Sequence, residues 1–411
     1  MKIQAIILAA GESSRFWPLN NRHKSLFAIM GKPIIWYTID SLKQSGVKDI
    51  IIIQNKEKHI EEELKKQDIK GVKIRFLIQE KQTGTGDAVL LAKDLLEDKF
   101  LVLNAEQFDV YLYAKKILAL KKDAVLTCSK TKNPSIYGIL NVSGDKVIGI
   151  TEKPEPGKEP SDLKILGIHC LNKEFLSYLQ KEPSHPYSLM IALAKYAQDK
   201  NVGFFDVKKE ESFTLKYPWN VFEIRDLIFK KYLKKKIQPG AKVAKTAVLQ
   251  GDIFVAKGAK IDEQTVIKGP CYIGPNSVIA ARNVLRGPLN IENDVHTGAM
   301  MELKDSIIQS GTHFHSGYLG NSVIGRDGRF GAGLLCANRR IDRKNILALV
   351  KEEKIDTGST YAGFYCGDNV KFGVGVKTMP GIMIGNNVIA GPGITIFKNV
   401  EDNKKIIQDE H

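Results

Sequence analysis

The chain of 411 residues lacks any long hydrophobic stretch. No run approaches the roughly 18 consecutive apolar residues that indicate a membrane-spanning helix. The apolar run Ile3 to Ala10 is too short and wrongly flanked for a secretory signal peptide. These absences predict a soluble, cytoplasmic protein that does not bind a membrane.

Cysteine is scarce, and no two cysteines form a C-x-x-C pair. The cysteines number 5 and are scattered along the chain: Cys128, Cys170, Cys271, Cys336 and Cys366. An odd, scattered set argues against both a disulfide framework and a zinc site. We therefore expect reduced thiols.

Acidic residues are outnumbered, since 61 Lys and Arg against 46 Asp and Glu give a formal net charge of +15. Such an excess favours anionic partners. The densest basic run, Lys230 to Lys236, falls in a predicted helix or linker, and no signature of a nucleic-acid-binding fold accompanies it. We therefore expect phosphorylated small molecules as partners, and no nucleic acid.

The sequence also lacks two familiar phosphate-binding fingerprints, G-x-x-x-x-G-K-[ST] and G-x-G-x-x-G. It has instead the small-residue segment Leu8-Ala9-Ala10-Gly11-Glu12-Ser13-Ser14-Arg15. The segment lies between a predicted strand, Ile3 to Leu8, and a predicted helix, Pro33 to Gln44, closed by Gly46. The plainest interpretation is an ordinary turn between a strand and a helix.

The composition of this turn favours a more specific interpretation. Ala10 and Gly11 have little or no side chain, so backbone N–H groups can approach phosphate oxygens. Arg15 and Lys24 can bring cations to an anionic leaving group. The turn therefore predicts a site for a nucleoside triphosphate.

Strands and helices alternate from residue 1 to about residue 205, which is typical of a mostly parallel α/β sheet. The predicted elements are strands at 49–54, 72–79 and 100–104, helices at 57–66 and 86–96, and a hairpin of 137–141 with 146–151. Ligands in such sheets bind at the carboxyl ends of the strands. Gly11, Gln79 and Glu106 should all lie at that edge.

From Val243 the hydrophobic period changes to six residues. Aliphatic residues occupy every sixth position at Val243, Leu249, Val255, Ile261, Ile267, Ile273, Ile279, Leu285 and Ile291. The period returns at Phe364, Val370, Val376, Ile382, Val388, Ile394 and Val400. Three short strands per coil, each pointing one aliphatic residue inward, explain this period, so we predict a parallel β-helix. Loops should leave the coil in the break between Thr297 and Asp356, which includes the polar segment Ala337 to Asp342.

The first half resembles the sugar-1-phosphate nucleotidylyltransferases, whose signature reads Leu-Ala-Ala-Gly-x-Gly-x-Arg, then Pro-Leu, a Lys and Lys-Pro. Ser13 stands where that family usually has its second Gly. The resemblance implies that Leu8, Ala10 and Gly11 bind the nucleotide and that Arg15 and Lys24 are catalytic. It also implies Mg²⁺, with Glu106 and Asn220 as oxygen ligands.

Base and sugar recognition also follow from the resemblance. The implied base-binding residues are Gln79, Gln82, Gly84 and Thr85. The implied sugar-phosphate residues are Tyr137, Gly138, Glu152 and Lys153. Ile165 occupies the usual Asn of an Asn-x-Gly-Ile motif, and Glu106 stands where the family has Asp. The plainer interpretation of Glu106 is a solvated acid at a strand end.

The second half resembles the acetyltransferase half of bifunctional sugar-1-phosphate enzymes of bacteria and archaea. Acetyl transfer to an amine needs a base, and the spacing His-x-x-Tyr-x-Gly identifies His315 as that base. Substrate-binding roles are implied for Arg286, Lys304, Tyr318, Asn338 and Lys344, and coenzyme A would approach at Ala332. His313 lacks the match and is expected to be structural. In this family the acetyl site forms between subunits, so a homotrimer is implied.

Together these features predict an α/β, Rossmann-like nucleotidyltransferase domain at 1–220, a basic linker helix at 221–240 and a left-handed β-helix of hexapeptide repeats at 241–411. The implied protein is a bifunctional enzyme that uses UTP or dTTP, a sugar-1-phosphate and acetyl-coenzyme A, with UDP-N-acetylglucosamine as product. One alternative is nucleotidyl transfer alone, of the glucose-1-phosphate thymidylyl or uridylyl type, with a structural or regulatory β-helix. Another is a non-catalytic regulator that binds nucleotide sugars, which Ser13, Glu106 and Ile165 would favour.

Overall fold

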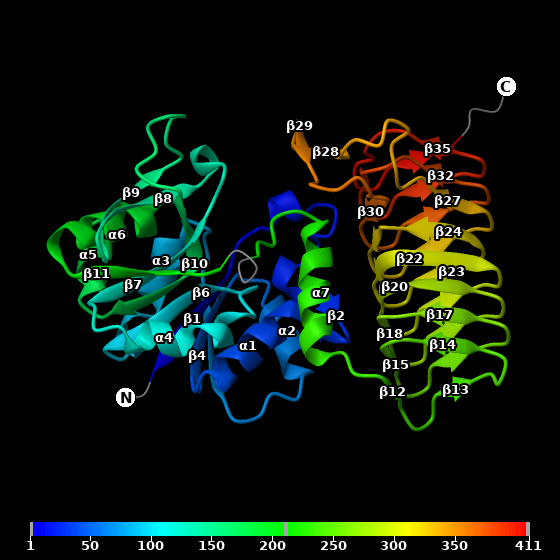
Figure 1. The fold of residues 1–411 in the computed structure, drawn as a ribbon, viewed down its shortest axis with the longest axis horizontal. Helices are drawn as coiled ribbons and strands as arrows, with labels where there is room; N and C mark the ends of the chain where they lie inside the picture. Colours follow the sequence, from blue (N-terminus) through cyan, green and yellow to red (C-terminus); the bar gives the residue numbers. More distant parts are fainter. Residues whose placement is uncertain (1–2, 209–212, 408–411) are drawn as a thin grey trace. The chain divides into compact units, whose positions relative to one another are not determined.

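The computed structural model describes residues 3–208 and 213–407, and the chain forms two compact units (Figure 1). The first unit comprises Met1–Glu12 and Pro33–Thr214, and the second comprises Ser13–Lys32 and Leu215–His411. The second unit therefore includes part of the predicted phosphate-loop region, which we had expected in a continuous first domain. No helix in the described ranges is long and apolar enough to cross a membrane.

A nine-stranded sheet forms the first unit, in the order β5-β4-β1-β6-β10-β7-β11-β9-β8. Its strands are β1 (Gln4–Ala9), β4 (Asp49–Gln54), β5 (Lys73–Ile78), β6 (Lys99–Asn104), β7 (Ala124–Lys130), β8 (Gly138–Ser143), β9 (Lys146–Glu152), β10 (Leu163–Asn172) and β11 (Val202–Asp206). The central pairs are parallel, as their continuous aliphatic runs predict. β8 and β9 form the expected antiparallel hairpin. β10 runs antiparallel to both β6 and β7, which the simple alternation did not predict.

Helices accompany this sheet, of which the first three lie close to the predicted positions and the later ones were not predicted. They are α1 (Ile34–Gln44), α2 (His59–Lys65), α3 (Thr85–Leu91), α4 (Ala114–Ala119), α5 (Phe175–Leu179) and α6 (Ser188–Asp199). α3 is shorter than predicted and continues as a 3₁₀ turn, Lys93–Leu95. One buried cluster joins aliphatic and aromatic residues of α3, α5 and α6 to the sheet.

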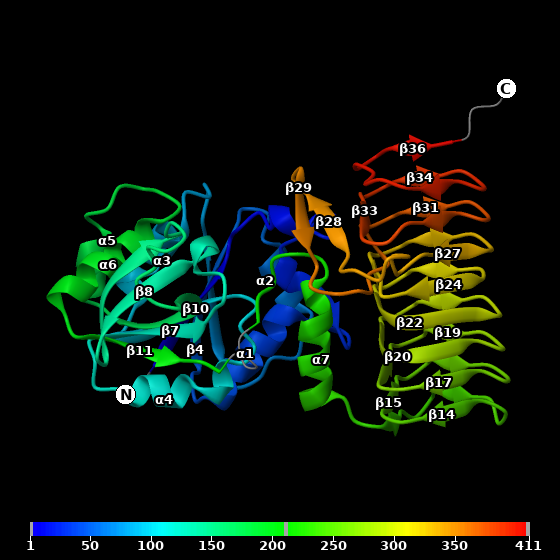
Figure 2. The same ribbon diagram turned by 45° about the horizontal axis from the view of Figure 1, so that its top comes forward.

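The second unit contains the predicted β-helix, whose coils stack along one axis (Figure 2). Ile261 pairs with Ile279 on the next coil, which is 18 residues, or three hexads, along the chain. Their side chains are about 1% and 0% exposed, as the inward-facing positions require. The six-residue period and the parallel β-helix are therefore confirmed.

The strands of the coils form three parallel ladders. The first ladder runs through β14 (Val248–Gln250), β17 (Val266–Lys268), β20 (Val284–Ile291), β22 (Met301–Ile308), β24 (Gly317–Gly320), β27 (Leu334–Cys336), β32 (Lys377–Thr378) and β35 (Thr395–Ile396). The second shares β20 and β22, which turn a corner, and adds β12 (Lys236–Ile237), β15 (Ile253–Val255), β18 (Cys271–Ile273), β25 (Val323–Ile324), β30 (Phe364–Cys366) and β33 (Ile382–Ile384). The third contains β13 (Lys242–Val243), β16 (Lys260–Ile261), β19 (Val278–Ile279), β21 (His296–Thr297), β23 (His313–Phe314), β26 (Arg329–Phe330), β31 (Lys371–Phe372), β34 (Ile389–Ala390) and β36 (Lys405–Ile406).

The expected break between Thr297 and Asp356 is only partly correct. The coil continues to Cys336, but Phe314 pairs with Phe330 after only 16 residues, which hides the six-residue period. The chain leaves the coil after β27 and returns at β30, and this excursion carries the hairpin of β28 (Leu347–Val350) and β29 (Glu353–Asp356). The six-residue period is therefore lost first because the coils become shorter, and only after Cys336 because the chain leaves the coil.

The segment Ser13–Lys32 follows the polar edge of the β-helix inside the second unit. Ala28 exchanges two hydrogen bonds with the side chain of Gln309, of 3.3 and 2.9 Å. The N–H of Met30 donates to Asn290 Oδ1 at 2.9 Å, and that of Gly31 donates to Glu292 Oε2 at 2.9 Å. Side chains of the coils thus satisfy backbone groups of the segment as a neighbouring strand would.

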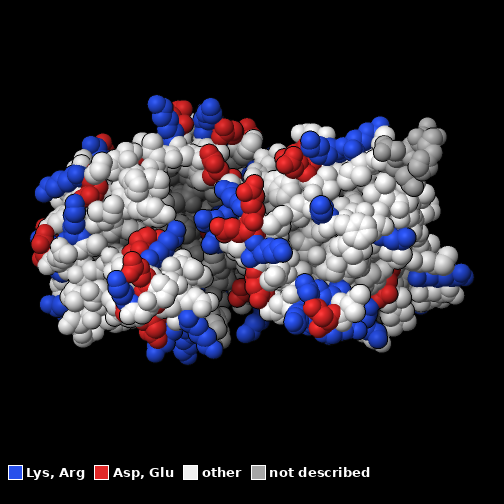
Figure 3. Space-filling model, turned by 90° about the horizontal axis from the view of Figure 1, so that it is seen from above, with Lys and Arg blue, Asp and Glu red and all other residues white. Residues whose placement is uncertain are grey.

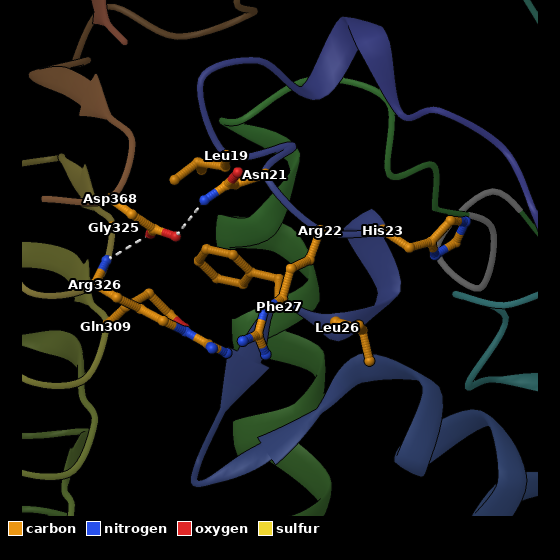
Figure 4. Close-up of a pocket in the computed structure, with 10 residues that line it drawn as sticks. All are labelled: Leu19, Asn21, Arg22, His23, Leu26, Phe27, Gln309, Gly325, Arg326 and Asp368. Atoms are coloured by element: carbon orange, nitrogen blue, oxygen red, sulfur yellow. Dashed lines mark hydrogen bonds between the residues drawn. The ribbon is translucent and has the colours of Figure 1, made fainter. Parts of the chain in front are cut away.

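The same segment encloses a small cavity of about 40 Å³ (Figure 4). Its lining residues are Leu19, Asn21, Arg22, His23, Leu26, Phe27, Gln309, Gly325, Arg326 and Asp368. Asn21 Nδ2 donates to Asp368 Oδ2 at 3.3 Å, while Asp368 Oδ1 accepts the N–H of Arg326 at 2.8 Å. A cavity of this volume has room for water but is far smaller than the roughly 300 Å³ of a typical ligand pocket.

α7 (Asn220–Tyr232) covers only the first part of the linker helix predicted at 221–240, because the helix ends at Tyr232 and β12 already pairs with β15 of the β-helix. Its last turn carries Lys230 and Lys231. Over the face shown in Figure 3, Lys and Arg side chains are interspersed with Asp and Glu. All 5 cysteines are buried and free, as predicted.

Candidate functional sites in the two units

Ser13 has a left-handed backbone, with φ of +56°. Glycine adopts this conformation without steric cost, which explains why a glycine would be usual there. The Ser13 hydroxyl oxygen accepts the backbone N–H of Lys24 at 3.1 Å. The serine therefore gives the loop an internal hydrogen bond that glycine cannot form.

The two predicted cations of the loop region have different surroundings. The ammonium of Lys24 donates to the carbonyl oxygen of Leu215 at 2.8 Å, whereas Arg15 is exposed. Burial raises the pKa of the Tyr217 phenol, and the charge of Arg15 lowers it. Arg15 thus lies near Tyr217, and Lys24 bonds to Leu215, two residues before Tyr217.

In the first unit, Gln79 and Gly84 are joined within the segment that is predicted to bind the nucleotide base. Gln79 is 7% exposed, and its Nε2 donates to the carbonyl oxygen of Gly84 at 3.0 Å. Gly84 has φ of +139°, and a Cβ there would lie 2.5 Å from the carbonyl oxygen of His185. Gln82 and Thr85 are exposed beside it. The buried glutamine shapes the segment, and the exposed residues face solvent.

The predicted sugar-phosphate residues converge on the hairpin. Gly138 and Glu152 are register partners, and a Cβ on Gly138 would lie 2.7 Å from Glu152 Oε2 and 3.1 Å from Ile165 Cγ2. Glu152 and Lys153 are exposed, and Lys153 has φ of +47°. Ile165 therefore presents an apolar surface next to the carboxylate that is predicted to bind a sugar hydroxyl.

Sequence reasoning missed two neighbours of these residues. The ammonium of Lys164 lies 5.0 Å from the centre of the Tyr137 ring. A Cβ on Gly167 would lie 2.2 Å from Asn104 Nδ2, so the amide of Asn104 packs directly on the backbone of β10. A lysine inside the otherwise apolar run of β10 was the available signal for Lys164.

The two predicted Mg²⁺ ligands differ in how well they suit the ion. Glu106 follows β6 and is 4% exposed, and its carboxylate is the type of oxygen donor that Mg²⁺ prefers. Asn220 Oδ1 already accepts the N–H groups of Tyr217 at 2.8 Å and Lys216 at 3.1 Å. Those two bonds use the lone pairs of the amide oxygen, so Asn220 shapes the turn before α7, and its role as an ion ligand stays a prediction. Among the described residues no group of three or more His, Cys, Asp or Glu could hold a metal.

Arg286 and Lys304, predicted to bind the sugar phosphate of the acetyl site, are register partners on successive coils. Arg286 pairs with the carboxylate of Glu302. The ammonium of Lys304 lies 4.7 Å from the centre of the Tyr361 ring. Tyr361, on the excursion, was not predicted, and it fixes Lys304 by a cation–π contact.

Tyr318 and Asn338 are joined by a hydrogen bond of 2.9 Å from the asparagine amide to the phenol oxygen. The same amide donates to Asn321 Oδ1 at 2.8 Å, and Asn321 Nδ2 donates to Asp305 Oδ2 at 2.7 Å. Burial raises the pKa of Tyr318, so the phenol stays neutral near pH 7. The structure thus brings two predicted residues together and adds Asn321 and Asp305 behind them.

The remaining predicted residues have no hydrogen bond to this network among the described residues. His315 is exposed after β23, and Lys344 is exposed on the excursion. Ala332 accepts the N–H of Gly375 at 2.7 Å. No hydrogen bond among the described residues joins the His315 side chain to Tyr318 or Asn338. His313 stacks on His296 with ring centres 4.4 Å apart, which agrees with its expected structural role.

A cavity of about 670 Å³ opens where the excursion leaves the coil. Its lining residues are Ala337, Arg339, Arg340, Ile341, Asp342, Ile346, Leu347, Met379 and Pro380. It is large enough for a small organic ligand. Of its two arginines, Arg340 forms an ion pair with Asp342 of the same lining, and Arg339 lies 4.7 Å from the centre of the Tyr361 ring. One of its lining residues, Ala337, directly precedes Asn338 in the chain.

Comparison with known proteins finds similarity over both units. Residues 4–213 match the nucleotidyl transferase family model. The "Bifunctional protein GlmU" of Methanococcus vannielii is 33% identical over 411 residues, covering 97% of this chain and 96% of that protein. The protein of the same name from Methanocaldococcus jannaschii is 32% identical, covering 98% and 96%. The "Bifunctional sugar-1-phosphate nucleotidylyltransferase/acetyltransferase" of Sulfurisphaera tokodaii is 32% identical, covering 97% and 98%. The chain therefore belongs to the family of bifunctional sugar-1-phosphate nucleotidylyltransferases/acetyltransferases.

Proposed function

We propose that this protein catalyses both reactions of its family, nucleotidyl transfer to a sugar-1-phosphate and acetyl transfer to an amino-sugar phosphate. The observation that carries the proposal is the full-length similarity to bifunctional relatives, which covers both units. The proposed product is UDP-N-acetylglucosamine.

In the nucleotidyl reaction, a phosphate oxygen of the sugar-1-phosphate attacks the α-phosphorus of UTP or dTTP. The bond from the α-phosphorus to its bridging oxygen breaks, and pyrophosphate leaves. Arg15 and Lys24 stabilise the charge that develops on that leaving group. Leu8, Ala10 and Gly11 offer backbone to the phosphates, and Glu152 and Lys153 hold the sugar phosphate.

Mg²⁺ bound to the phosphates would neutralise charge in this transition state, with Glu106 as a protein oxygen donor. Asn220, the second predicted ligand, also has a proposed structural role. It holds the turn of Lys216 and Tyr217 through two hydrogen bonds, and so keeps Leu215 in place for Lys24.

In the acetyl reaction, the amine nitrogen attacks the thioester carbonyl of acetyl-coenzyme A, the C–S bond breaks, and the thiol leaves. His315 accepts the proton that the amine loses. Arg286 and Lys304 hold the sugar phosphate, Tyr318 and Asn338 orient the amine, and Lys344 and Ala332 border the acetyl donor.

We propose a homotrimer, because His315 is exposed and has no hydrogen bond to the Tyr318 network among the described residues of one chain. Val284 and Leu335 on the first ladder are 39% and 49% exposed, which suits a covered face. Light scattering should give three times the 45.8 kDa of one chain. A cytoplasmic location is part of the proposal because both co-substrates are cytoplasmic metabolites.

A substrate panel tests the proposal. UTP and dTTP are each combined with glucose-, glucosamine- and N-acetylglucosamine-1-phosphate, and release of pyrophosphate is measured with Mg²⁺ present. Thiol release from acetyl-coenzyme A is measured with the amino sugar. We expect both activities in one preparation. Nucleotide binding without any turnover would instead support a regulator, and pyrophosphate release alone would support a structural β-helix.

A further inference from the structure

The hairpin of β28 and β29 contacts the segment that begins at Ser13. The ammonium of Lys351, at the hairpin turn, donates a hydrogen bond of 2.9 Å to Ser14 Oγ, 337 residues earlier in the sequence. Lys351 and Glu352 have φ of +47° and +68°, which makes the turn tight. A cation from the repeat half is therefore held one residue before Arg15.

The ammonium of Lys351 has capacity left for an anion. Among residues 3–208 and 213–407, no carboxylate lies within ion-pair distance of it, and its hydrogen-bond partner is the neutral hydroxyl of Ser14. A lysine ammonium has three N–H donors, so two remain. A charged partner would bind it more strongly than a hydroxyl does.

A charge of the hairpin and a charge of the loop both act on the Tyr217 phenol, whose pKa burial raises. The charge of Glu353 raises the pKa of that phenol, and the charge of Arg15 lowers it. Glu353 therefore opposes anion binding here, while Arg15 and Lys351 favour it. An anion that binds must contact the cations more closely than it approaches Glu353.

We propose that Lys351 binds a phosphate oxygen of the nucleoside triphosphate together with Arg15, so that the hairpin of the excursion supplies a second phosphate-binding cation within the second unit. This inference rests on the proposed nucleotidyl transfer. It gives the excursion from the β-helix a role in substrate binding.

The test compares Lys351→Ala with Lys354→Ala, which removes the same charge from the same hairpin. Lys354 is exposed and its register partner is Leu349, so it controls for long-range charge. Lys351→Ala should raise the KM for UTP or dTTP about tenfold, the loss of one charged hydrogen bond, with the KM for the sugar-1-phosphate within about twofold. Lys354→Ala should change either constant by less than about twofold. Lys351→Arg should restore most of the binding, and Glu353→Gln should lower the KM for the nucleotide.

Calorimetric titration of each variant with UTP and dTTP provides a readout that does not need turnover. If the wild type binds nucleotide but transfers it to no sugar, the proposed function fails, and the titration still decides the role of Lys351. Equal nucleotide affinity of Lys351→Ala and Lys354→Ala would overturn the inference. So would a Lys351→Ala variant whose two KM values rise together while its melting temperature falls, because Lys351 would then only support the fold.

Discussion

Arg225 on α7 and Asp305 on β22 form an ion pair of 2.8 Å in which the arginine side chain is 1% exposed. The same guanidinium donates to Asp226 Oδ1 at 2.9 Å and to the carbonyl oxygen of Pro288 at 3.0 Å. Asp305 also accepts the amide of Asn321, which bonds Asn338. One buried cation therefore links α7 to the network of the acetyl site.

Arg225→Met should lower the free energy of unfolding of the second unit by about 2 kcal/mol. Breaking a fully buried pair costs about 3–5 kcal/mol, but Asp226 and Asp305 remain partly exposed and can be hydrated. Urea unfolding followed by circular dichroism measures the change. Lys230→Ala, at an exposed position of the same helix, is the matched control and should cost less than about 0.5 kcal/mol. A loss no larger than that of the control would contradict the anchoring role of Arg225.

The buried carboxyl of Glu292 should make stability depend on pH. Burial raises its pKa from 4.5 to about 7, although bonds from Asn290 and Gly31 and the charge of Arg326 act in the other direction. The folded state binds the proton of this carboxyl more tightly than the unfolded state does. The protonated carboxyl therefore contributes its full share to the free energy of unfolding below about pH 4.5, and this contribution is lost as pH rises through 7.

Glu292→Gln removes that titration, so the variant should gain stability relative to the wild type, by about 2–3 kcal/mol between pH 5 and pH 8. Urea unfolding at several pH values measures the difference. Glu263→Gln, at an exposed site on the coils, should show no such trend. A constant difference between Glu292→Gln and the wild type would mean that Glu292 ionises normally.

Two glycines of the first unit should respond differently to alanine. At Gly84, φ is +139° and the obstructing atom is the backbone oxygen of His185, which cannot move, so Gly84→Ala should cost about 2–3 kcal/mol. At Gly138 the nearest atom is the flexible end of Glu152, so the fold should survive within about 1 kcal/mol. Displacement of that carboxylate should raise the KM for the sugar-1-phosphate. An unchanged KM in Gly138→Ala would show that Glu152 does not contact the sugar.

The sequence predicted the elements whose pattern is local. Strand β4 appears at the predicted residues, and the run from Val243 to Ile291 gives coils of three hexads because each hexad turns alike. The coil between Thr297 and Cys336 was missed because its 16-residue turns have a different period.

Contacts between residues far apart in the sequence were also missed. The bonds of Gly31 to Glu292 and of Lys351 to Ser14 join residues that are 261 and 337 positions apart. No period or motif records such pairs, because they depend on how the segments pack in three dimensions. The positive φ of Ser13 was also missed, because serine rarely adopts this backbone conformation. Its hydroxyl bonds to the N–H of Lys24, and this contact too depends on how the chain folds.

The most direct test of two separate reactions in one chain is to assay the wild type, Arg15→Ala and His315→Ala for pyrophosphate release and thiol release. We predict that His315→Ala loses thiol release by at least about a hundredfold and keeps pyrophosphate release within about twofold. Arg15→Ala should show the reverse pattern. Full acetyl transfer by His315→Ala, or loss of both activities in both variants, would contradict this account.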